Sequence, residues 1–263
     1  MTSYMTFHPG IDITPTEEPM GFRYGPDCFG PVPEIRKLDS IRASLLDPDC
    51  DGPEDVYAIA MDIGKKGHET LLRDRMLLFG AVTYARGRLG SEPVRSQGHI
   101  HKISAHCGWS TPEIYEIWRG RAVILMQEFA HDDPGRCFAV YASPGDVVVV
   151  PPYWVHATVS ADPGEPLTFG AWCDRDYGFE YDEVRVHGGL AYFPLIGESG
   201  ELKWQRNTRY KDSELIQKAP QGYSNLEIRE EVPIYTQFEQ NPDTFLFVSC
   251  PVRKKEAWAH FVP

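Results

Sequence analysis

Three histidines and one glutamate near the middle of the chain have the types and spacing of metal ligands. His99 and His101 are two residues apart, and side chains at i and i+2 of an extended strand project from the same face, so both imidazoles can approach one ion. Glu113 opens the next apolar run, which Gly120 closes, and His156 follows a later apolar run and a Pro-containing turn. Three nitrogens and one carboxylate suit Fe(II), Mn(II), Ni(II), Co(II) or Zn(II), with positions left for water or substrate. The pattern therefore predicts a metal site.

The same residues also have an ordinary explanation. A single histidine on a strand is more often solvated or hydrogen bonded within the fold than bound to a metal, and H-x-H alone does not decide between the two. The glutamate and the third histidine at their set distances favour the metal site. His106 and Cys107 lie in the loop before Glu113, and we interpret them as surface residues. The remaining histidines show no comparable pattern and receive no role; they are His8, His68, His131, His187 and His260.

The predicted ligands lie in a region of short apolar runs separated by turn residues, from Val56 to Gly170. Runs at this spacing predict many short strands in a sandwich or barrel, and the 22 prolines and 23 glycines spread along the chain agree with that. We therefore predict a mainly β fold. The runs are 56–61, 76–84, 113–118, 122–126, 146–150 and 167–169.

The flanking segments differ from this region in composition and in the spacing of their apolar residues. Residues 1–34, rich in Pro and Gly, predict an irregular arm, and apolar residues at helical spacing predict a helix over 33–46. A second helix is predicted over 211–218. The tail from 222 to 263 has a strand-like piece at 246–248 but too little apolar material for its own core, so we expect it to wrap on the barrel or on a partner subunit. The predicted divisions are 1–55, an N-terminal arm and helix packing on the barrel; 56–205, the barrel; and 206–263, a C-terminal extension.

The composition argues against several classes of partner. Lys+Arg 26 against Asp+Glu 38 gives a formal net charge of −12. Because an acidic surface repels nucleic-acid phosphates and anionic lipids, we expect no nucleic acid and no membrane as partner. No run approaches the roughly 18 apolar residues of a membrane span, and the N-terminus has no secretion pattern. The six cysteines form no C-x-x-C pair; disulfides stay open, but reduced thiols in a cytoplasmic protein are favoured.

The predicted metal ligands resemble the two signature motifs of the cupin superfamily, a small double-stranded β-barrel of the jelly-roll type. Tyr153 stands where the second motif usually has Gly. The spacing from His101 to Glu113 is longer than usual, which predicts a widened loop over 104–111. The first motif matches His99, His101, Glu113 and Gly120, and the second matches Gly145, Pro151 and His156.

Longer stretches resemble the cupin-type glucose-6-phosphate isomerases of archaea and some bacteria. Residues 96–101 (S-Q-G-H-I-H), 112–115 (P-E-I-Y) and 150–159 (V-P-P-Y-W-V-H-A-T-V) are similar to the family's G-H-x-H, E-x-Y and P-P-Y-W-x-H-x-T-V. The resemblance covers residues 33–205, and the C-terminal extension has no counterpart in the short archaeal enzymes.

The resemblance implies an enzyme of glycolysis and gluconeogenesis, an isomerase that interconverts glucose 6-phosphate and fructose 6-phosphate by proton transfer between C2 and C1. It implies one divalent metal per subunit, with Fe2+ favoured over Zn2+, Mn2+, Ni2+ or Co2+, held by the four residues above. Glu113 is the implied catalytic proton shuttle, and a metal-assisted hydride shift is the competing mechanism. A homodimer is implied by family analogy. The implied substrate-binding residues are Ser96, Gly98, Thr83, Tyr57, Tyr115 and Tyr177.

An anionic sugar phosphate needs a local positive field in this acidic chain. Four basic residues cluster around the H-x-H stretch, and they either provide this field or form a solvated rim. These are Arg86, Arg88, Arg95 and Lys102.

The chain also departs from the family pattern. Arg175 stands where the family has a histidine before Asp176-Tyr-Gly178, and a tyrosine usually found upstream is missing. An arginine stays protonated and is a poor proton shuttle. Two alternatives therefore stay open: another cupin metalloenzyme, such as a different sugar isomerase or epimerase or an Fe(II) dioxygenase, and a non-catalytic sugar-phosphate-binding module.

Overall fold

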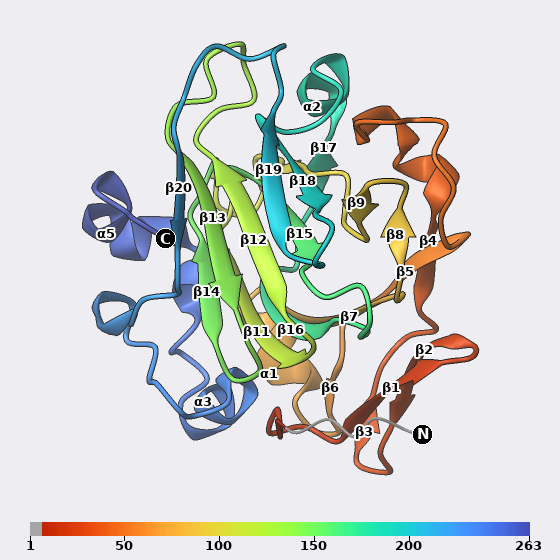
Figure 1. Cartoon of the computed structure of the whole chain (residues 1–263). Helices are drawn as coiled ribbons and strands as arrows, with labels where there is room; N and C mark the ends of the chain where they lie inside the picture. Colours follow the sequence, from red (N-terminus) through yellow and green to blue (C-terminus); the bar gives the residue numbers. More distant parts are fainter. Residues whose placement is uncertain (1–6) are drawn as a thin grey trace.

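Two facing β-sheets form the centre of the molecule in the computed structural model, which describes residues 7–263 (Figure 1). All neighbouring strands of the larger sheet are antiparallel. In the smaller sheet, only the last pair is parallel. In spatial order, the larger sheet consists of β14 (Val147–Val150), β11 (Glu113–Arg119), β16 (Thr168–Asp174), β7 (Leu77–Tyr84), β5 (Asp55–Met61) and β4 (Glu34–Lys37). The smaller consists of β15 (Val155–Ser160), β12 (Ala122–Gln127), β13 (Cys137–Ala142) and β20 (Leu215–Lys218).

Both faces of the two sheets are covered, which explains why strands such as β7 and β12 are almost wholly apolar. On β7, Leu78 lies in the core between the sheets, whereas Phe79 points to the opposite face of its sheet. On β12, Ile124 lies in the same central core and Val123 lies on the outside of the smaller sheet. This mainly β, two-sheet jelly-roll arrangement confirms the predicted fold class.

The N-terminal segment is more regular than predicted. Its described part, from residue 7, contains the hairpin β1 (Ile13–Glu17) and β2 (Met20–Tyr24) and the short strand β3 (Cys28–Phe29). The predicted helix over 33–46 is wrong. Residues 34–37 form the edge strand β4, and two 3-10 turns follow, η1 (Leu38–Ser40) and η2 (Arg42–Ser44). The apolar spacing fits an edge strand and two turns equally well, and pairing of β4 with β5 decides the outcome.

Two further elements differ from the sequence prediction. The predicted helix over 211–218 is wrong, because Leu215–Lys218 pairs as β20 with β13. The strand-like piece at 246–248 is instead helical and belongs to α4 (Leu246–Ser249). In both cases a short apolar run fits either conformation, and the neighbour it packs on selects one.

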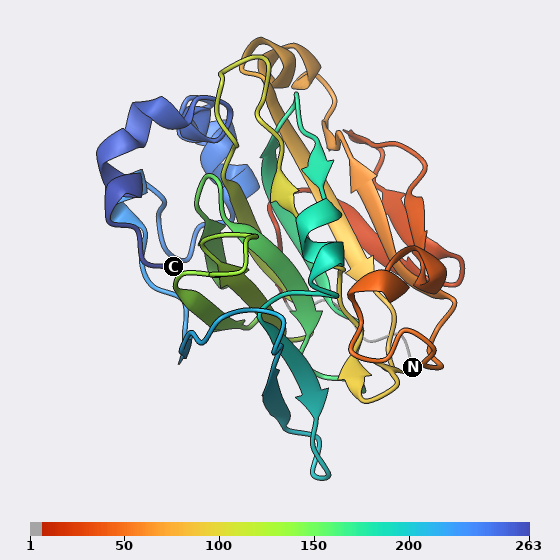
Figure 2. The ribbon, with the colours of Figure 1, turned by 90° about the horizontal axis from the view of Figure 1, so that it is seen from above.

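The C-terminal segment packs on the outer face of the larger sheet. Tyr235 and Phe238 of α3 (Ile234–Gln240) and Phe245 surround Trp172 of β16, with ring centroids 4.9 to 5.8 Å from that indole. Figure 2 shows the C-terminal helices toward the left of the sheets and the N-terminal hairpin toward the right, and residues of both belong to one apolar cluster with Phe79 of the larger sheet. Of the two expected positions for this tail, the structure gives the one on the barrel of the same chain.

The remaining elements are short connections around the sheets. All six cysteines are free. Among the helices of residues 7–263, none is long and apolar enough to cross a membrane. The remaining strands are β6 (Gly64–Lys65), β8 (Arg88–Leu89), β9 (Glu92–Pro93), β10 (Ile100–His101), β17 (Phe179–Glu180), β18 (Tyr192–Ile196) and β19 (Leu202–Arg206), and the remaining helices are α1 (Glu69–Asp74), α2 (Asp182–Val186), η3 (Ser224–Leu226), η4 (Pro251–Lys254) and α5 (Lys255–Ala259).

Candidate active site

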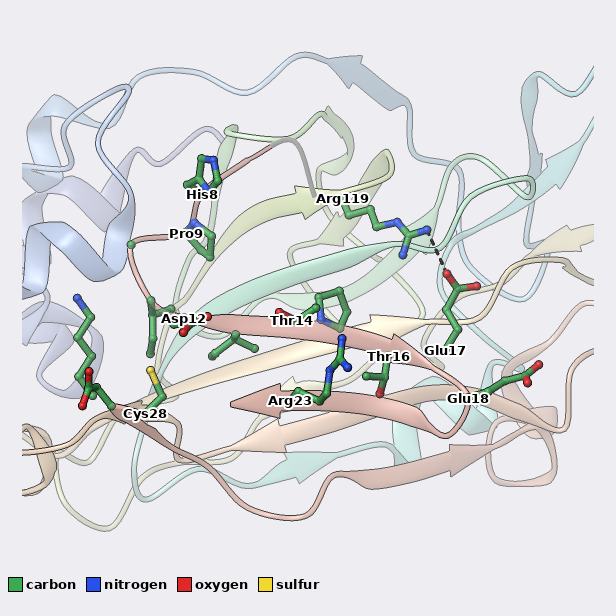
Figure 3. Close-up of a pocket in the computed structure, with 16 residues that line it drawn as sticks. His8, Pro9, Asp12, Thr14, Thr16, Glu17, Glu18, Arg23, Cys28 and Arg119 are labelled. Atoms are coloured by element: carbon green, nitrogen blue, oxygen red, sulfur yellow. Dashed lines mark hydrogen bonds and ion pairs between the residues drawn. The ribbon is translucent and has the colours of Figure 1, made fainter. Parts of the chain in front are cut away.

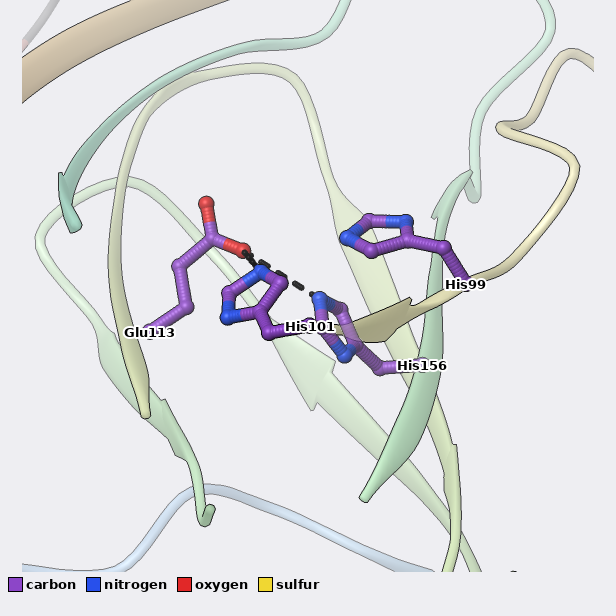
Figure 4. A group of neighbouring side chains, drawn as sticks. All are labelled: His99, His101, Glu113 and His156. Carbon is purple, nitrogen blue, oxygen red and sulfur yellow. Dashed lines mark hydrogen bonds and ion pairs between the residues drawn. The ribbon is translucent and has the colours of Figure 1, made fainter. Parts of the chain in front are cut away.

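The four predicted metal ligands converge on one point. His99 pairs with His156 through two backbone hydrogen bonds of 3.0 and 2.9 Å, and this bridge sets both side chains beside each other. His101 lies on β10, and Glu113 begins β11 in the larger sheet. Figure 4 shows the four side chains pointing toward one another. One ligand atom from each lies within 4.8 Å of the others.

The backbone before His99 requires glycine. Gly98 has φ of +87°, a left-handed conformation, and a Cβ there would lie 2.1 Å from Leu190 Cδ1. The glycine therefore lets the chain turn into the bridge with His156. By contrast, Tyr153 occupies the position that is usually Gly in the second motif, and it adopts φ of +72° despite its side chain. Its amide donates to Ser110 Oγ at 3.1 Å, which ties this turn to the 104–111 loop.

The hydrogen bonds of the imidazoles assign their tautomers. His101 Nδ1 lies 2.8 Å from Thr111 O and His156 Nδ1 lies 3.2 Å from Trp154 O, so each Nδ1 donates to a carbonyl. In a neutral ring each Nε2 then carries a lone pair, and it faces Glu113 Oε2, at 3.3 Å from His101 and 3.2 Å from His156. Two lone pairs aimed at a carboxylate oxygen repel it in the absence of a cation. This arrangement fits a metal ion between them.

Two of the ring nitrogens that converge here lack hydrogen-bond partners in the described structure. Nε2 of His99 and Nε2 of His101 are buried and have no hydrogen-bond partner in the described structure. Buried polar atoms are normally paired, so these two nitrogens fit the ligands of an ion. Burial lowers the pKa of His156 and holds that of His99 well below its usual range. Neutral imidazole, the form that binds metals, is therefore the form present at pH 7.

The carboxylate of Glu113 is fixed from two sides. The Tyr115 hydroxyl donates to Oε2 at 2.8 Å, and the Cys173 thiol donates to Oε1 at 3.2 Å. Glu113 is therefore held in one orientation by a donor at each of its oxygens.

A cavity of about 70 Å³ adjoins these ligands, and His99 and Glu113 form part of its wall. Three of the predicted substrate-binding residues, Tyr57, Ser96 and Tyr115, line it. Gly98 is the neighbour of His99 but is not part of the wall. The whole lining consists of Arg36, Tyr57, Ile59, Met61, Val82, Tyr84, Ser96, Gln97, His99, Glu113, Tyr115, Thr158, Phe169, Phe179 and Tyr181.

Besides Gly98, two predicted substrate-binding residues lie outside the wall of this cavity. Thr83 lies between Val82 and Tyr84, which line the cavity, so its side chain projects from the opposite face of β7. Its hydroxyl is hydrogen bonded to that of Thr168 at 3.0 Å. Tyr177 is 41% exposed and packs on the cavity residue Phe179, with 5.4 Å between ring centroids.

Arg175 points away from the ligands, although it occupies the position of a family histidine. Its guanidinium makes two bonds to Asp62, of 2.9 and 2.7 Å, and donates from Nε to Leu77 O. The Arg175 side chain therefore links the start of β7 to the residue that follows β5, at one end of the larger sheet. His187 cannot replace that histidine, because it pairs with Asp132 at 3.1 Å and stacks on Tyr210.

The basic residues predicted near the H-x-H do not line the cavity either. Arg95 is buried against Glu92 at 2.7 Å, and Arg86 pairs with Glu17 at 3.1 Å. The cavity instead contains Arg36 of β4, which sequence reasoning missed. With the segment interpreted as a helix, the alternation that places Arg36 on the inner face of an edge strand could not be seen.

A larger hollow of about 1100 Å³ lies elsewhere, between the β1–β2 hairpin and the barrel. Figure 3 shows its wall, where Glu17 and Arg119 are joined by a 3.1 Å ion pair. None of the four clustered ligands belongs to this wall. Size alone therefore does not identify the candidate site.

Among solved structures, the chain shows only partial likeness to cupin proteins. A cupin 2 domain-containing protein from Halorhodospira halophila is 16% identical, with a TM-score of 0.29 over 41% of this chain and 61% of that one. A Bacillus subtilis oxalate decarboxylase is 17% identical, with a TM-score of 0.30 over 47% of this chain and 27% of that one. These scores are too low to bear on function.

Sequence comparison is more decisive. The model of the family "Glucose-6-phosphate isomerase (GPI)" matches residues 49–213, which include all four clustered ligands. The glucose-6-phosphate isomerase of Thermococcus onnurineus is 32% identical over 185 residues, 67% of this chain and 87% of that protein. That of Thermococcus gammatolerans is 29% identical over 184 residues, 67% of this chain and 86% of that protein. The chain therefore belongs to the glucose-6-phosphate isomerase family.

Proposed function

We propose that this protein is a metal-dependent aldose–ketose isomerase that interconverts glucose 6-phosphate and fructose 6-phosphate. The observation that carries the proposal is the convergence of three imidazoles and one carboxylate beside a cavity, in a chain of this family. His99, His101, Glu113 and His156 would hold one divalent ion, with Fe2+ favoured over Zn2+, Mn2+, Ni2+ or Co2+. When bound, such an ion supplies positive charge that stabilises the enediolate oxygens.

Glu113 is the proposed catalytic proton shuttle between C2 and C1. It is the carboxylate that lines the cavity, and its hydrogen bonds to Tyr115 and Cys173 hold it in one orientation. Abstraction of a proton next to a carbonyl requires a fixed base within reach of the carbon. The competing hydride shift transfers no hydrogen to solvent. If a substrate labelled with deuterium at C2 loses that deuterium to water during turnover, the result supports proton transfer.

The substrate must enter through a wall that moves. A cavity of about 70 Å³ is well below the ~300–1,000 Å³ of typical ligand pockets. Phe179 and Tyr181 form part of its wall, and the only strand with which β17 pairs in the described structure is the two-residue strand β10. We propose that this segment opens to admit the sugar, which Tyr57, Ser96, Tyr115, the Gly98 amide and, at the rim, Tyr177 then contact.

Metal removal and reconstitution test the proposal. Chelator-treated protein is expected to lose interconversion of the two sugar phosphates and to regain it with Fe(II), Mn(II) or Zn(II). Glu113→Gln is expected to abolish turnover, whereas Glu214→Gln, at an exposed carboxylate, leaves it unchanged. A protein that turns over neither sugar phosphate with any of these metals contradicts the substrate assignment.

A second candidate rests on Arg175. Because its guanidinium is bound to Asp62, the position of the family histidine supplies no proton-transfer group here. This favours a different sugar isomerase or epimerase, or an Fe(II) dioxygenase, at the same ligands. Turnover of other phosphosugars identifies the first and oxygen consumption the second. Sugar-phosphate binding that survives Glu113→Ala, in a protein without turnover, identifies a non-catalytic binding module.

A further inference from the structure

We propose that Arg36 recognises the phosphate group of the sugar phosphate and so determines the preference for a phosphorylated substrate. The inference deepens the proposed function and rests on it for the identity of the sugar. It assigns a binding role to a residue of the N-terminal segment, outside residues 49–213 that match the family model.

The fold carries Arg36 into the cavity. β4 is the edge strand of the larger sheet, and Arg36 lies opposite Tyr57 of β5, which also lines the cavity. The pairing shifts by one residue between Arg36 and Lys37. Such irregularities re-aim side chains at the edge of a sheet. Lys37 consequently lies outside the cavity wall and pairs with Glu54 and Asp55 at the surface.

The guanidinium of Arg36 has unused hydrogen-bonding capacity. Its Nε is buried and has no partner in the described structure. Its one carboxylate contact is Nη2 to Glu34 Oε1, at 2.9 Å, and the Glu34 side chain is 66% exposed. Because water screens exposed pairs, this contact is weak and can be exchanged for a ligand. Arg175 and Arg95, by contrast, are fully engaged by protein acceptors.

The charges of the cavity wall make Arg36 the group that fits a phosphate. Among the described residues that line the cavity, it is the only Arg or Lys, and the chain as a whole is acidic. Burying a phosphate that carries up to two negative charges requires a cation close by. The planar guanidinium can make two parallel hydrogen bonds to phosphate oxygens. Since Glu113 lines the same cavity, one substrate can contact both residues.

Binding of inert sugar acids tests this inference without turnover. Calorimetry on metal-loaded protein compares 6-phosphogluconate with gluconate, which lacks only the phosphate. We expect the wild type to prefer 6-phosphogluconate, and Arg36→Gln to weaken that binding by roughly 10- to 100-fold while gluconate binding stays unchanged. Arg36→Lys should recover part of the loss, because it restores the charge without the planar geometry.

Lys37→Gln is the matched control, a neighbouring cation on the same strand, and it should bind both compounds like the wild type. The inference is overturned if Arg36→Gln, folded by circular dichroism, keeps the preference for 6-phosphogluconate, or if the wild type shows no such preference. Failure of the proposed function is a separate outcome. Phosphate preference that depends on Arg36, in a protein that does not isomerise glucose 6-phosphate, leaves this inference standing and removes the isomerase.

Discussion

At the scale of single residues, the orientation of Glu113 depends on a cysteine. The Cys173 thiol donates to Glu113 Oε1, while the other oxygen faces the histidines. Because Cys173→Ala removes this donor, we expect kcat to fall about 2- to 10-fold, the size of one modest hydrogen bond. Bound metal, measured by elemental analysis, should not change, since no metal ligand is altered.

Cys173→Ser is the informative companion variant, because the hydroxyl also donates to the carboxylate. It should retain more of kcat than Cys173→Ala does. If both variants keep the wild-type kcat, the thiol has no positioning role and Tyr115 alone fixes the carboxylate.

Residue-scale prediction succeeded where strand geometry alone places the side chain. The i, i+2 spacing put His99 and His101 on one face, and the structure brings both to Glu113. The prediction that Thr83 contacts the substrate was wrong. Which face of β7 its side chain occupies depends on how the strand is placed relative to the core, and the sequence does not give that placement. Arg36 was missed because its preference for the inner face follows from β4 pairing with β5, a contact that local sequence does not encode.

At the scale of elements, one buried carboxylate links the C-terminal segment to the barrel. Glu116 of β11 is 1% exposed, accepts the amide of Ile234 at the start of α3 at 2.8 Å, and accepts Trp118 Nε1 at 2.9 Å. Burial raises its pKa from 4.5 to about 8, and the two hydrogen bonds only partly oppose this. The carboxyl is therefore protonated in the folded protein at a pH where it is ionised in the unfolded chain.

This raised pKa predicts that stability falls as the pH rises from about 4.5 to about 8. Between the unfolded and folded pKa values the native state binds the extra proton, so the stabilisation is present below about pH 4.5 and is lost as pH rises through about 8. The loss is on the order of a few kcal/mol, since one pKa unit corresponds to about 1.4 kcal/mol. Glu116→Gln, which cannot ionise, should show a flatter dependence of the free energy of unfolding on pH.

Urea unfolding of both proteins from pH 5 to 9 measures this difference. Glu116→Gln is expected to lower the free energy of unfolding by a constant amount at every pH, because its amide nitrogen cannot accept a hydrogen bond from the second donor. The quantity to compare is therefore the slope of the free energy of unfolding with pH. The exposed variant Glu214→Gln should follow the wild type. Parallel curves for wild type and Glu116→Gln contradict a raised pKa for Glu116.

The sequence predicts helix or strand correctly for the segments that are buried on both faces. The runs of β7, β11, β12 and β14 are too short and too apolar for amphipathic helices, and all four are strands in the structure. The segments 33–46, 211–218 and 246–248 are short, and the first and last bury apolar residues such as Ile41 and Val248 against the sheets. Their conformation follows from the sheet edge or aromatic layer on which they pack, and the sequence pattern alone is compatible with either.

At the scale of the whole molecule, both sheets are already covered by their own chain. The C-terminal segment buries the outer face of the larger sheet, including Phe79, Trp118 and Trp172. The outer face of the smaller sheet is covered by α2 and the β18–β19 hairpin, including Val184 and Trp204. A homodimer, which stays a prediction, must therefore use surfaces other than these two faces.

Deleting residues 221–263 tests whether this segment acts as a cover. The deletion exposes an aromatic layer that is otherwise buried, and large exposed apolar patches drive self-association. We expect the shortened chain to form larger species than the full chain in size-exclusion chromatography with light scattering, and to bind a hydrophobic dye more strongly. The four metal ligands come from β10, β11, β15 and the bridge at His99, all outside the deleted segment, so chelator-sensitive metal binding should persist in any folded fraction. If the shortened chain keeps the association state and the dye binding of the full-length protein, the covering role is contradicted. Exposure of Phe79, Trp118 and Trp172 should change at least one of these two measurements.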